Sequence, residues 1–224
     1  MKLQYLGDSR DSFKWHYHDY LMNHNPNAGQ FGYIPMLRPD NGTSEGSTSS
    51  IDYEASPECQ RFCSLLRCDR NISDVRLLPK YTDSDYRVAI LKPSTYYSLA
   101  TRDDYFKSYF SANIVLVDPC NGFEPNNATD NHVLYEDISY YIHTLPKRAV
   151  FSVYQHFRRK NFIDDYAEIS DRIKIHNRML HTTAICWRSD VMFVQVTVSK
   201  DEAELIRDIN QTYASLNKDV YVID

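Results

Sequence analysis

Short apolar runs alternate with amphipathic stretches along most of this chain. The clearest run is Ile114–Val117, which is apolar, rich in β-branched residues and bounded by turn residues. Such a run is typical of a strand buried on both faces. Proline cannot donate to a strand ladder, so we expect this strand to end at Asp118–Pro119. The other predicted strands are Lys2–Leu6, Phe31–Leu37, Val75–Leu78, Tyr86–Leu91, Ala149–Tyr154, His181–Arg188, Val191–Val198 and Val220–Ile223, the last as an edge strand or a tail.

Helical periodicity marks the segments between these runs. An apolar stripe at helical spacing follows Gly7, with Asp11 or Ser12 as its expected cap. Ser56–Pro57 has the residues of a helix start, and Ser199 with Glu202 forms a capping box. The helical stripes are Phe13, Tyr17, Tyr20 and Leu21; Cys59, Phe62, Cys63 and Leu66; Asp103–Phe110; Leu134 to Leu145; Phe162 to Ile173; and Ile206 to Leu216.

The order of elements predicts the fold class. From residue 112 onward strands and helices alternate and then a hairpin follows, joined at Ser189–Asp190. We therefore expect an α/β, Rossmann-like, mostly parallel sheet with helices on both faces and a C-terminal antiparallel hairpin. The length of 224 residues fits a single domain over 1–224. Within it we expect a mobile loop or lid at 39–52 and an irregular insertion at 71–101.

The composition and charge of the chain limit which kinds of partner it can bind. The net charge is −5, so any contact with nucleic acid needs a local basic patch, and Arg158–Lys160 is the only run of three basic residues. The sequence has no apolar run of membrane-spanning length, and its first residues turn polar too soon for a signal peptide. Five cysteines without a framework spacing predict reduced thiols and a cytoplasmic protein. Cys59, Cys63 and Cys68 have the chemistry of metal ligands, but the first two share an apolar helix stripe, which favours packing.

Polar side chains gather where predicted strands end. Asp118, Asn121 and Glu124 follow the central strand, and we assign them, with His156, as candidate catalytic residues. Ligands bind at the carboxyl ends of strands in open α/β sheets, so we expect this cluster to lie at a ligand-binding site. The candidate ligand-binding residues are Asp8, Ser9, Lys14, Asp40 and Gln155. The junction at Gly7–Asp8 also predicts backbone amides that could receive an anion, if a strand precedes the helix.

The distal half, 112–215, resembles the S-adenosylmethionine-dependent methyltransferase fold. The resemblance rests on the element order, the C-terminal hairpin and Asp118–Pro119, because the fourth strand of that fold often ends in an Asp-Pro motif at the reactive centre. It implies S-adenosylmethionine as cofactor, met by Asp8 or Asp40. It also implies that Asp118 and Asn121 orient a target amino group and that tyrosines stack on a base.

Nearly the whole chain also resembles a family of small, mostly uncharacterised bacterial and phage proteins. The matching motifs are Gly7-Asp8-Ser9 with Lys14, Pro35-Met36-Leu37 with Pro39-Asp40, Glu45-Gly46, Asp118-Pro119 with Asn121-Gly122 and Glu124, and Tyr154-Gln155-His156-Phe157. Members typically carry Asp where this chain has Cys120. The family implies no activity, and it suggests a role in phage or defence biology.

Three functions follow from these patterns. The first is a methyltransferase-like protein that acts on or binds a nucleotide or nucleic acid. The second is a Mg²⁺-dependent phosphodiesterase or nuclease, with Asp8, Asp40, Asp118 and Glu124 on the metal and His156 as acid, base or ligand. The third is a non-enzymatic protein that binds a nucleotide or a partner.

Overall fold

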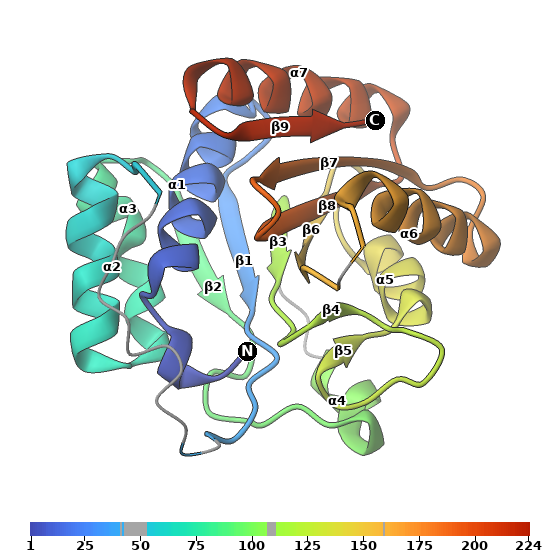
Figure 1. Ribbon diagram of the computed structural model, residues 1–224, viewed down its shortest axis with the longest axis horizontal. Helices are drawn as coiled ribbons and strands as arrows, with labels where there is room; N and C mark the ends of the chain where they lie inside the picture. Colours follow the sequence, from blue (N-terminus) through green and yellow to red (C-terminus); the bar gives the residue numbers. More distant parts are fainter. Residues whose placement is uncertain (41, 43–52, 107–110, 159) are drawn as a thin grey trace.

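A mixed seven-stranded sheet forms the centre of the computed structural model, which describes residues 1–40, 42, 53–106, 111–158 and 160–224 (Figure 1). The strand order is β2-β1-β3-β6-β8-β7-β9. A second, two-stranded sheet pairs β4 with β5. The strands are β1 Gln30–Ile34, β2 Arg87–Ile90, β3 Ile114–Val117, β4 Gly122–Phe123, β5 His132–Val133, β6 Val150–His156, β7 His181–Trp187, β8 Val191–Thr197 and β9 Val220–Ile223.

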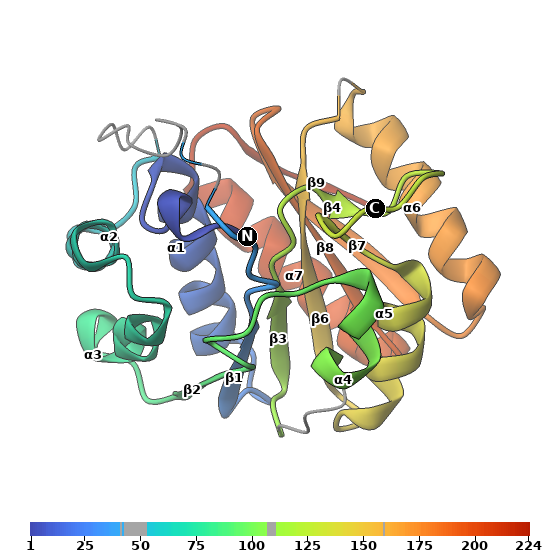
Figure 2. The same cartoon turned by 90° about the horizontal axis from the view of Figure 1, so that it is seen from below.

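Helices cover both faces of this sheet, and Figure 2 shows the strands between α1 on one side and α4, α5 and α6 on the other. The α-helices are α1 Ser9–His24, α2 Pro57–Asp69, α3 Leu78–Thr82, α4 Arg102–Phe106, α5 Tyr135–Tyr141, α6 Phe162–His176 and α7 Lys200–Leu216. The 3-10 helices are η1 Leu3–Tyr5, η2 Ile72–Leu77, η3 Leu99–Thr101 and η4 Ile142–Thr144.

Two hydrophobic cores lie on the two faces. Side chains alternate along β3, so that Ile114 and Leu116 pack into the core under α1, α2 and α7, while Val115 and Val117 pack into the core under α4, α5 and α6. All four are buried. The prediction of a strand buried on both faces is therefore confirmed.

The α/β class is confirmed, but the sheet is less parallel than predicted. The pairs β2–β1, β1–β3 and β3–β6 are parallel, whereas β6–β8, β8–β7 and β7–β9 are antiparallel. The hairpin β7–β8 returns so that β8 inserts between β6 and β7. Because β9 then pairs with β7, Val220–Ile223 is an edge strand, and half of the sheet is antiparallel.

Two predicted strands are wrong. Lys2–Leu6 forms the 3-10 helix η1, and Val75–Leu78 spans the end of η2 and the start of α3. Both neighbours of β1 are already present as β2 and β3, so no edge beside it remains for an N-terminal strand. At the second place the Asn71 side chain caps η2 and Pro79 stands in the first turn of α3, which favours helical geometry.

The predicted start of α1 is also corrected. The helix begins at Ser9, and its N-cap is Asp8, whose side chain accepts hydrogen bonds from the backbone amides of Arg10 and Asp11. The carboxylate thus occupies amides that an anion would need. With the preceding strand also absent, the structure does not provide the predicted strand–turn–helix anion site.

The two predicted irregular segments have different outcomes. Segment 71–101 supplies η2, α3 and η3, and also β2, which pairs in register with β1. Of the loop at 39–52, residues 41 and 43–52 lie outside the described residues. Asp40 is described, and its side chain accepts a hydrogen bond from the backbone of Gly42.

Candidate functional site

A polar cavity of about 600 Å³ lies at the carboxyl end of β3. The chain leaves β1 to form β2 on one side and then returns to form β3 on the other, so the direction of winding reverses between β1 and β3. Such a switch point is where open α/β sheets bind ligands. The lining residues are Met1, Lys2, Tyr5, Asp8, Ser9, Arg10, Asp11, Lys14, Asp118, Pro119, Cys120, Asn121, Asn131, Tyr154, His156, Trp187 and Asp190.

Asp118 is the residue that β3 delivers to this cavity. Its backbone amide continues the pairing with β1 by donating to the Ile34 carbonyl, which fixes its position, and the residue is 2% exposed. Its Oδ2 accepts two hydrogen bonds, from Lys14 Nζ at 2.9 Å and from the Tyr33 hydroxyl at 2.7 Å. Its Oδ1 receives no donor from the described residues. One carboxylate oxygen thus has two donors, and the other has none among the described residues.

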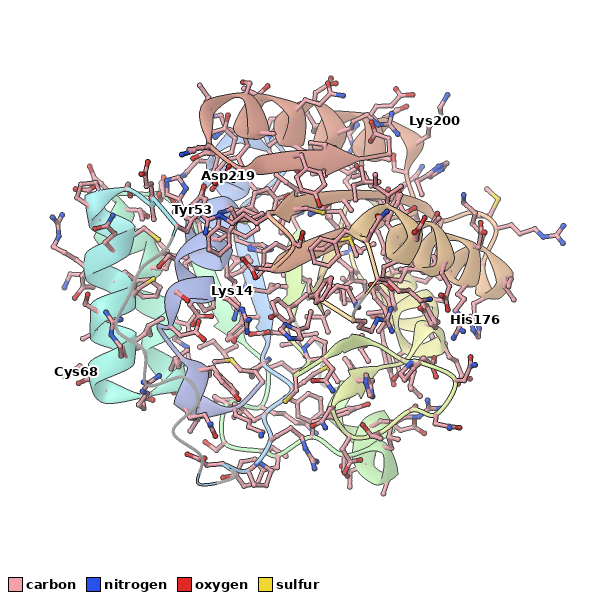
Figure 3. All side chains as sticks on the ribbon, viewed as in Figure 1. Lys14, Tyr53, Cys68, His176, Lys200 and Asp219 are labelled. Atoms are coloured by element: carbon pink, nitrogen blue, oxygen red, sulfur yellow. The ribbon has the colours of Figure 1, made fainter. Side chains whose placement is uncertain are left out.

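Lys14, labelled near the middle of the view in Figure 3, is buried between two carboxylates. Its Nζ is 2.6 Å from Asp11 Oδ1 and 2.9 Å from Asp118 Oδ2, and all three side chains are almost fully buried. Burial by itself lowers the pKa of Lys14, but the charges of Asp11 and Asp118 outweigh it and raise the pKa above its ordinary value. The ammonium is therefore charged, and the group of three carries a net charge of −1.

Asp8 supplies a second carboxylate to the same cavity. Burial, and then the charge of Asp11, raise the pKa of Asp8 to about 6, against the opposing charge of Lys14. Only its Oδ1 is used in capping α1. A carboxyl that titrates near pH 6 in a ligand-sized cavity can exchange a proton with a bound group.

The facing wall comes from the end of β6. Tyr154 and His156 point to the same side of this strand, and the Tyr154 hydroxyl lies 3.3 Å from His156 Nδ1. Burial, and then the charge of Arg10, lower the pKa of His156. The imidazole is therefore neutral at pH 7 and has one donor and one acceptor nitrogen.

Six of the nine candidate residues line the cavity: Asp8, Ser9, Lys14, Asp118, Asn121 and His156. Asn121 is held there by its backbone amide, which donates to the Asn131 carbonyl at 3.0 Å. Glu124, Asp40 and Gln155 are not among the lining residues.

Gln155 holds the loop after β3 in place. Its side chain is buried, accepts from the Phe123 amide at 2.9 Å and donates to Asp165 Oδ2 at 3.1 Å. Gly122 makes this contact possible, because its φ is +101° and a Cβ there would lie 2.1 Å from Gln155 Oε1.

Glu124 and Asp40 have local partners. Glu124 Oε1 accepts from the backbone amide of Tyr135 at 2.8 Å and so caps the first turn of α5. Asp40 is exposed, six positions beyond the end of β1, because that strand ends at Ile34 and not at Leu37.

Two side chains that contact the Lys14–Asp118 pair escaped the sequence-based prediction. Asp11 was assigned only as a cap, although its spacing of three from Lys14 on a helix is a recognisable ion-pair signal. Tyr33 sits within a buried strand, and nothing in its sequence context distinguishes it from a core tyrosine. Its contact with Asp118 follows only from the parallel pairing of β1 and β3.

Neither the predicted Mg²⁺ site nor the three cysteines considered as metal ligands form a cluster of ligands in the described part of the chain. No three His, Cys, Asp or Glu side chains among these residues are grouped so that they could hold a metal ion. Cys59 and Cys63 are buried in the core, and Cys68 is exposed. Mg²⁺ binding remains a prediction.

The basic run does not form an open basic patch in its described residues. Arg158 pairs with the buried Asp165 at 2.8 Å, and Lys160 pairs with Glu168 at 2.5 Å. Arg159 lies outside the described residues.

Within the described ranges, no helix combines the length and the apolar character that crossing a bilayer requires. Comparisons with protein-family models, with curated proteins and with solved structures found no significant match for this chain.

Proposed function

We propose that the cavity at the end of β3 binds a nucleotide-type ligand through the exocyclic amino group of its base. The observation that carries this proposal is Asp118 Oδ1, a carboxylate oxygen of a residue that lines the cavity and is 2% exposed, to which no described residue donates. Buried acceptors that stay unpaired are costly, so a ligand that donates an N–H to this oxygen gains selectivity as well as affinity.

The rest of the lining suits such a ligand. Tyr5, Tyr154 and Trp187 offer ring surfaces on which a base can stack. Lys2 and Arg10 line the same cavity and supply positive charge for a phosphate. The volume of about 600 Å³ lies within the range of small-molecule sites.

This arrangement favours a methyltransferase-like protein with a Rossmann-like domain. Asp118–Pro119 follows the strand beside β1, and the last two long strands form the hairpin β7–β8. S-adenosylmethionine would supply the methyl group. The residues after β1 do not provide a glycine-rich cradle for it, because Pro35–Met36 stand there, and the Met36 carbonyl accepts from the Met1 backbone nitrogen at 2.8 Å. We therefore derive no methyl-transfer step.

Thermal-shift titrations test the proposal with adenosine monophosphate against inosine monophosphate, which has a carbonyl oxygen in place of the amino group. We expect stabilisation by the adenine nucleotide alone, approaching about 2.7 kcal/mol at 100 times the dissociation constant. S-adenosylmethionine and its demethylated product, each with EDTA, form a second arm that tests the methyltransferase assignment.

Variants show whether Asp118 is responsible. Asp118→Asn presents an amide that can donate to the inosine carbonyl oxygen, so we expect the preference to shift toward inosine monophosphate. Asp190→Asn changes another carboxylate of the lining and should leave the preference unchanged. Absence of binding by every purine and pyrimidine nucleotide at millimolar concentration would refute the proposed ligand class.

A further inference from the structure

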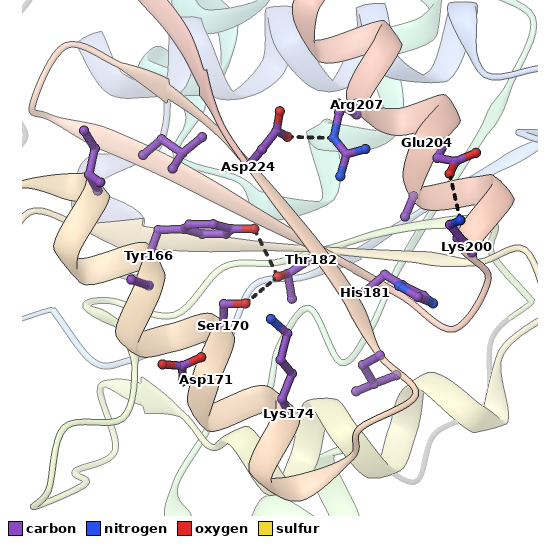
Figure 4. A pocket seen from close by; sticks show the side chains of 15 residues that line it. Tyr166, Ser170, Asp171, Lys174, His181, Thr182, Lys200, Glu204, Arg207 and Asp224 are labelled. Atoms are coloured by element: carbon purple, nitrogen blue, oxygen red, sulfur yellow. Dashed lines mark hydrogen bonds and ion pairs between the residues drawn. The ribbon is translucent and has the colours of Figure 1, made fainter.

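A second cleft, of about 480 Å³, lies between α6 and α7 at the β9 edge of the sheet (Figure 4). It shares no lining residue with the cavity at Asp118. Its wall from α6 includes Tyr166, Ser170 and Lys174, which are four positions apart and so share one helix face. Its floor is the beginning of β7, with His181 and Thr182.

Three hydroxyl groups are joined on this floor. The Tyr166 hydroxyl lies 3.1 Å from Thr182 Oγ1, and Ser170 Oγ lies 2.9 Å from the same oxygen. Three hydroxyls carry three hydrogens, and the two bonds use two of them whichever way each bond points. One O–H donor is therefore left over, and no described residue accepts it. Tyr166 is 6% exposed and Ser170 is 7% exposed, so this donor sits in largely buried surroundings.

Cationic side chains surround the same floor. Figure 4 shows Lys174 directed from α6 toward Thr182, and Arg207 reaching in from α7. Lys174 has no hydrogen-bond or ion-pair partner among the described residues. The Arg207 Nε donates to Asp224 Oδ1 at 2.8 Å. No described residue accepts from its two terminal nitrogens.

The acidic residues of the cleft are mostly engaged. Asp224 Oδ1 accepts from Arg207 and also from Thr183 at 3.1 Å, while Glu204 lies 3.5 Å from Lys200. Asp171 also lines the cleft, is exposed, and has no hydrogen-bond or ion-pair partner among the described residues. At the floor itself, the spare hydroxyl hydrogen, Lys174 and the terminal nitrogens of Arg207 are donors to which no described residue offers an acceptor.

We propose that this cleft binds the oxyanion of a small organic phosphate or carboxylate. Lys174, the spare hydroxyl hydrogen and the terminal nitrogens of Arg207 donate to its oxygens. The apolar part of the molecule packs on Ile163, Leu180 and Ile223, which also line the cleft.

Backbone amide NMR titrations of the full chain test this site with inorganic phosphate and with acetate, at constant ionic strength against chloride. We expect saturable shifts at residues 166–182. Saturable shifts with phosphate alone identify a phosphoryl ligand, and saturable shifts with acetate alone identify a carboxylate. No saturation by either anion up to tens of millimolar would overturn the proposal.

Lys174→Gln is the decisive variant, because its exposed position on α6 preserves the fold. Removing a charged donor should weaken the apparent affinity about tenfold or more. Thr182→Val should weaken it as well. Lys218→Gln, an exposed lysine outside the cleft, is the matched control and should bind as the unmodified protein does. Equal affinity of the Lys174→Gln and Lys218→Gln variants would show that only general electrostatic attraction is present.

Discussion

Lys14 and Asp118 stand 104 positions apart in the chain, and their side chains form a buried ion pair with 2.9 Å between Nζ and Oδ2. This pair joins the first turns of α1 to the carboxyl end of the central strand β3. Asp11, on the other side of Lys14, makes it a group of two carboxylates and one ammonium. The arrangement fixes the orientation of Asp118 and leaves its Oδ1 without a donor among the described residues.

Replacing Lys14 by Met should destabilise the protein strongly. The change leaves Asp11 and Asp118 buried without their shared cation, and breaking a buried ion pair from one side costs about 3–5 kcal/mol. Urea denaturation measures the loss, with Lys80→Met, at an exposed position of α3, as the control. A loss below about 1 kcal/mol would mean that water or a rearrangement compensates both carboxylates.

Asp8→Asn should remove a pH-dependent part of the stability. The folded-state pKa of Asp8 is raised from 3.8 to about 6, so the folded state binds the proton more tightly than the unfolded state. The stabilisation linked to this proton is complete below pH 3.8 and is lost as the pH rises through 6. The Asn variant keeps an N-cap and carries no charge.

We therefore expect the two proteins to differ little near pH 4. Above pH 6 the Asn variant should be the more stable, by up to about 3 kcal/mol. Unfolding free energies measured across this range give the difference. Subtracting the two curves also cancels Asp137, whose pKa is likewise raised to about 6 by burial. A pH-independent difference would contradict the raised pKa of Asp8.

Gly122→Ala should disturb the loop that carries Asn121. The new Cβ would meet Gln155 Oε1 at 2.1 Å and Gln155 Cα at 3.0 Å, and φ is +101°. Strain and displacement together should cost about 2 kcal/mol or more. Gly29→Ala is the control, because nothing lies within 4 Å of its added Cβ. In thermal denaturation Gly122→Ala should unfold at a lower temperature than Gly29→Ala, and equal melting temperatures would contradict this account.

Tyr33→Phe should reveal how much the hydroxyl contributes to holding Asp118. A hydrogen bond to a charged group contributes about 1.5–3 kcal/mol, and here the donor is fully buried. Tyr96→Phe, at a position that is 57% exposed, should change the stability little. Chemical denaturation of both variants decides the matter, and equal effects would assign Tyr33 to packing alone.

Local sequence patterns predicted much of the fold. The apolar run of β3, the helix starts at Ser56 and Ser199 and the hairpin at Ser189–Asp190 all act over a few residues, so the sequence displays them directly. Short mixed segments such as Lys2–Leu6 were predicted wrongly because periodicity over five residues does not separate a strand from a 3-10 turn. Both sides of β1 are occupied, by β2 and β3, and that is a property of the whole sheet.

The sequence by itself determined where β3 ends, and it named six of the residues that line the cavity. The tertiary structure alone decided what each does there. Parallel pairing in register sets Tyr33 of β1 beside the end of β3, and the packing of α1 brings Lys14 to the same carboxylate. Gln155 and Glu124 also have polar side chains, but each accepts a hydrogen bond from a backbone amide and does not line the cavity. Side-chain type is written in the sequence, whereas its partner depends on contacts between segments far apart along the chain.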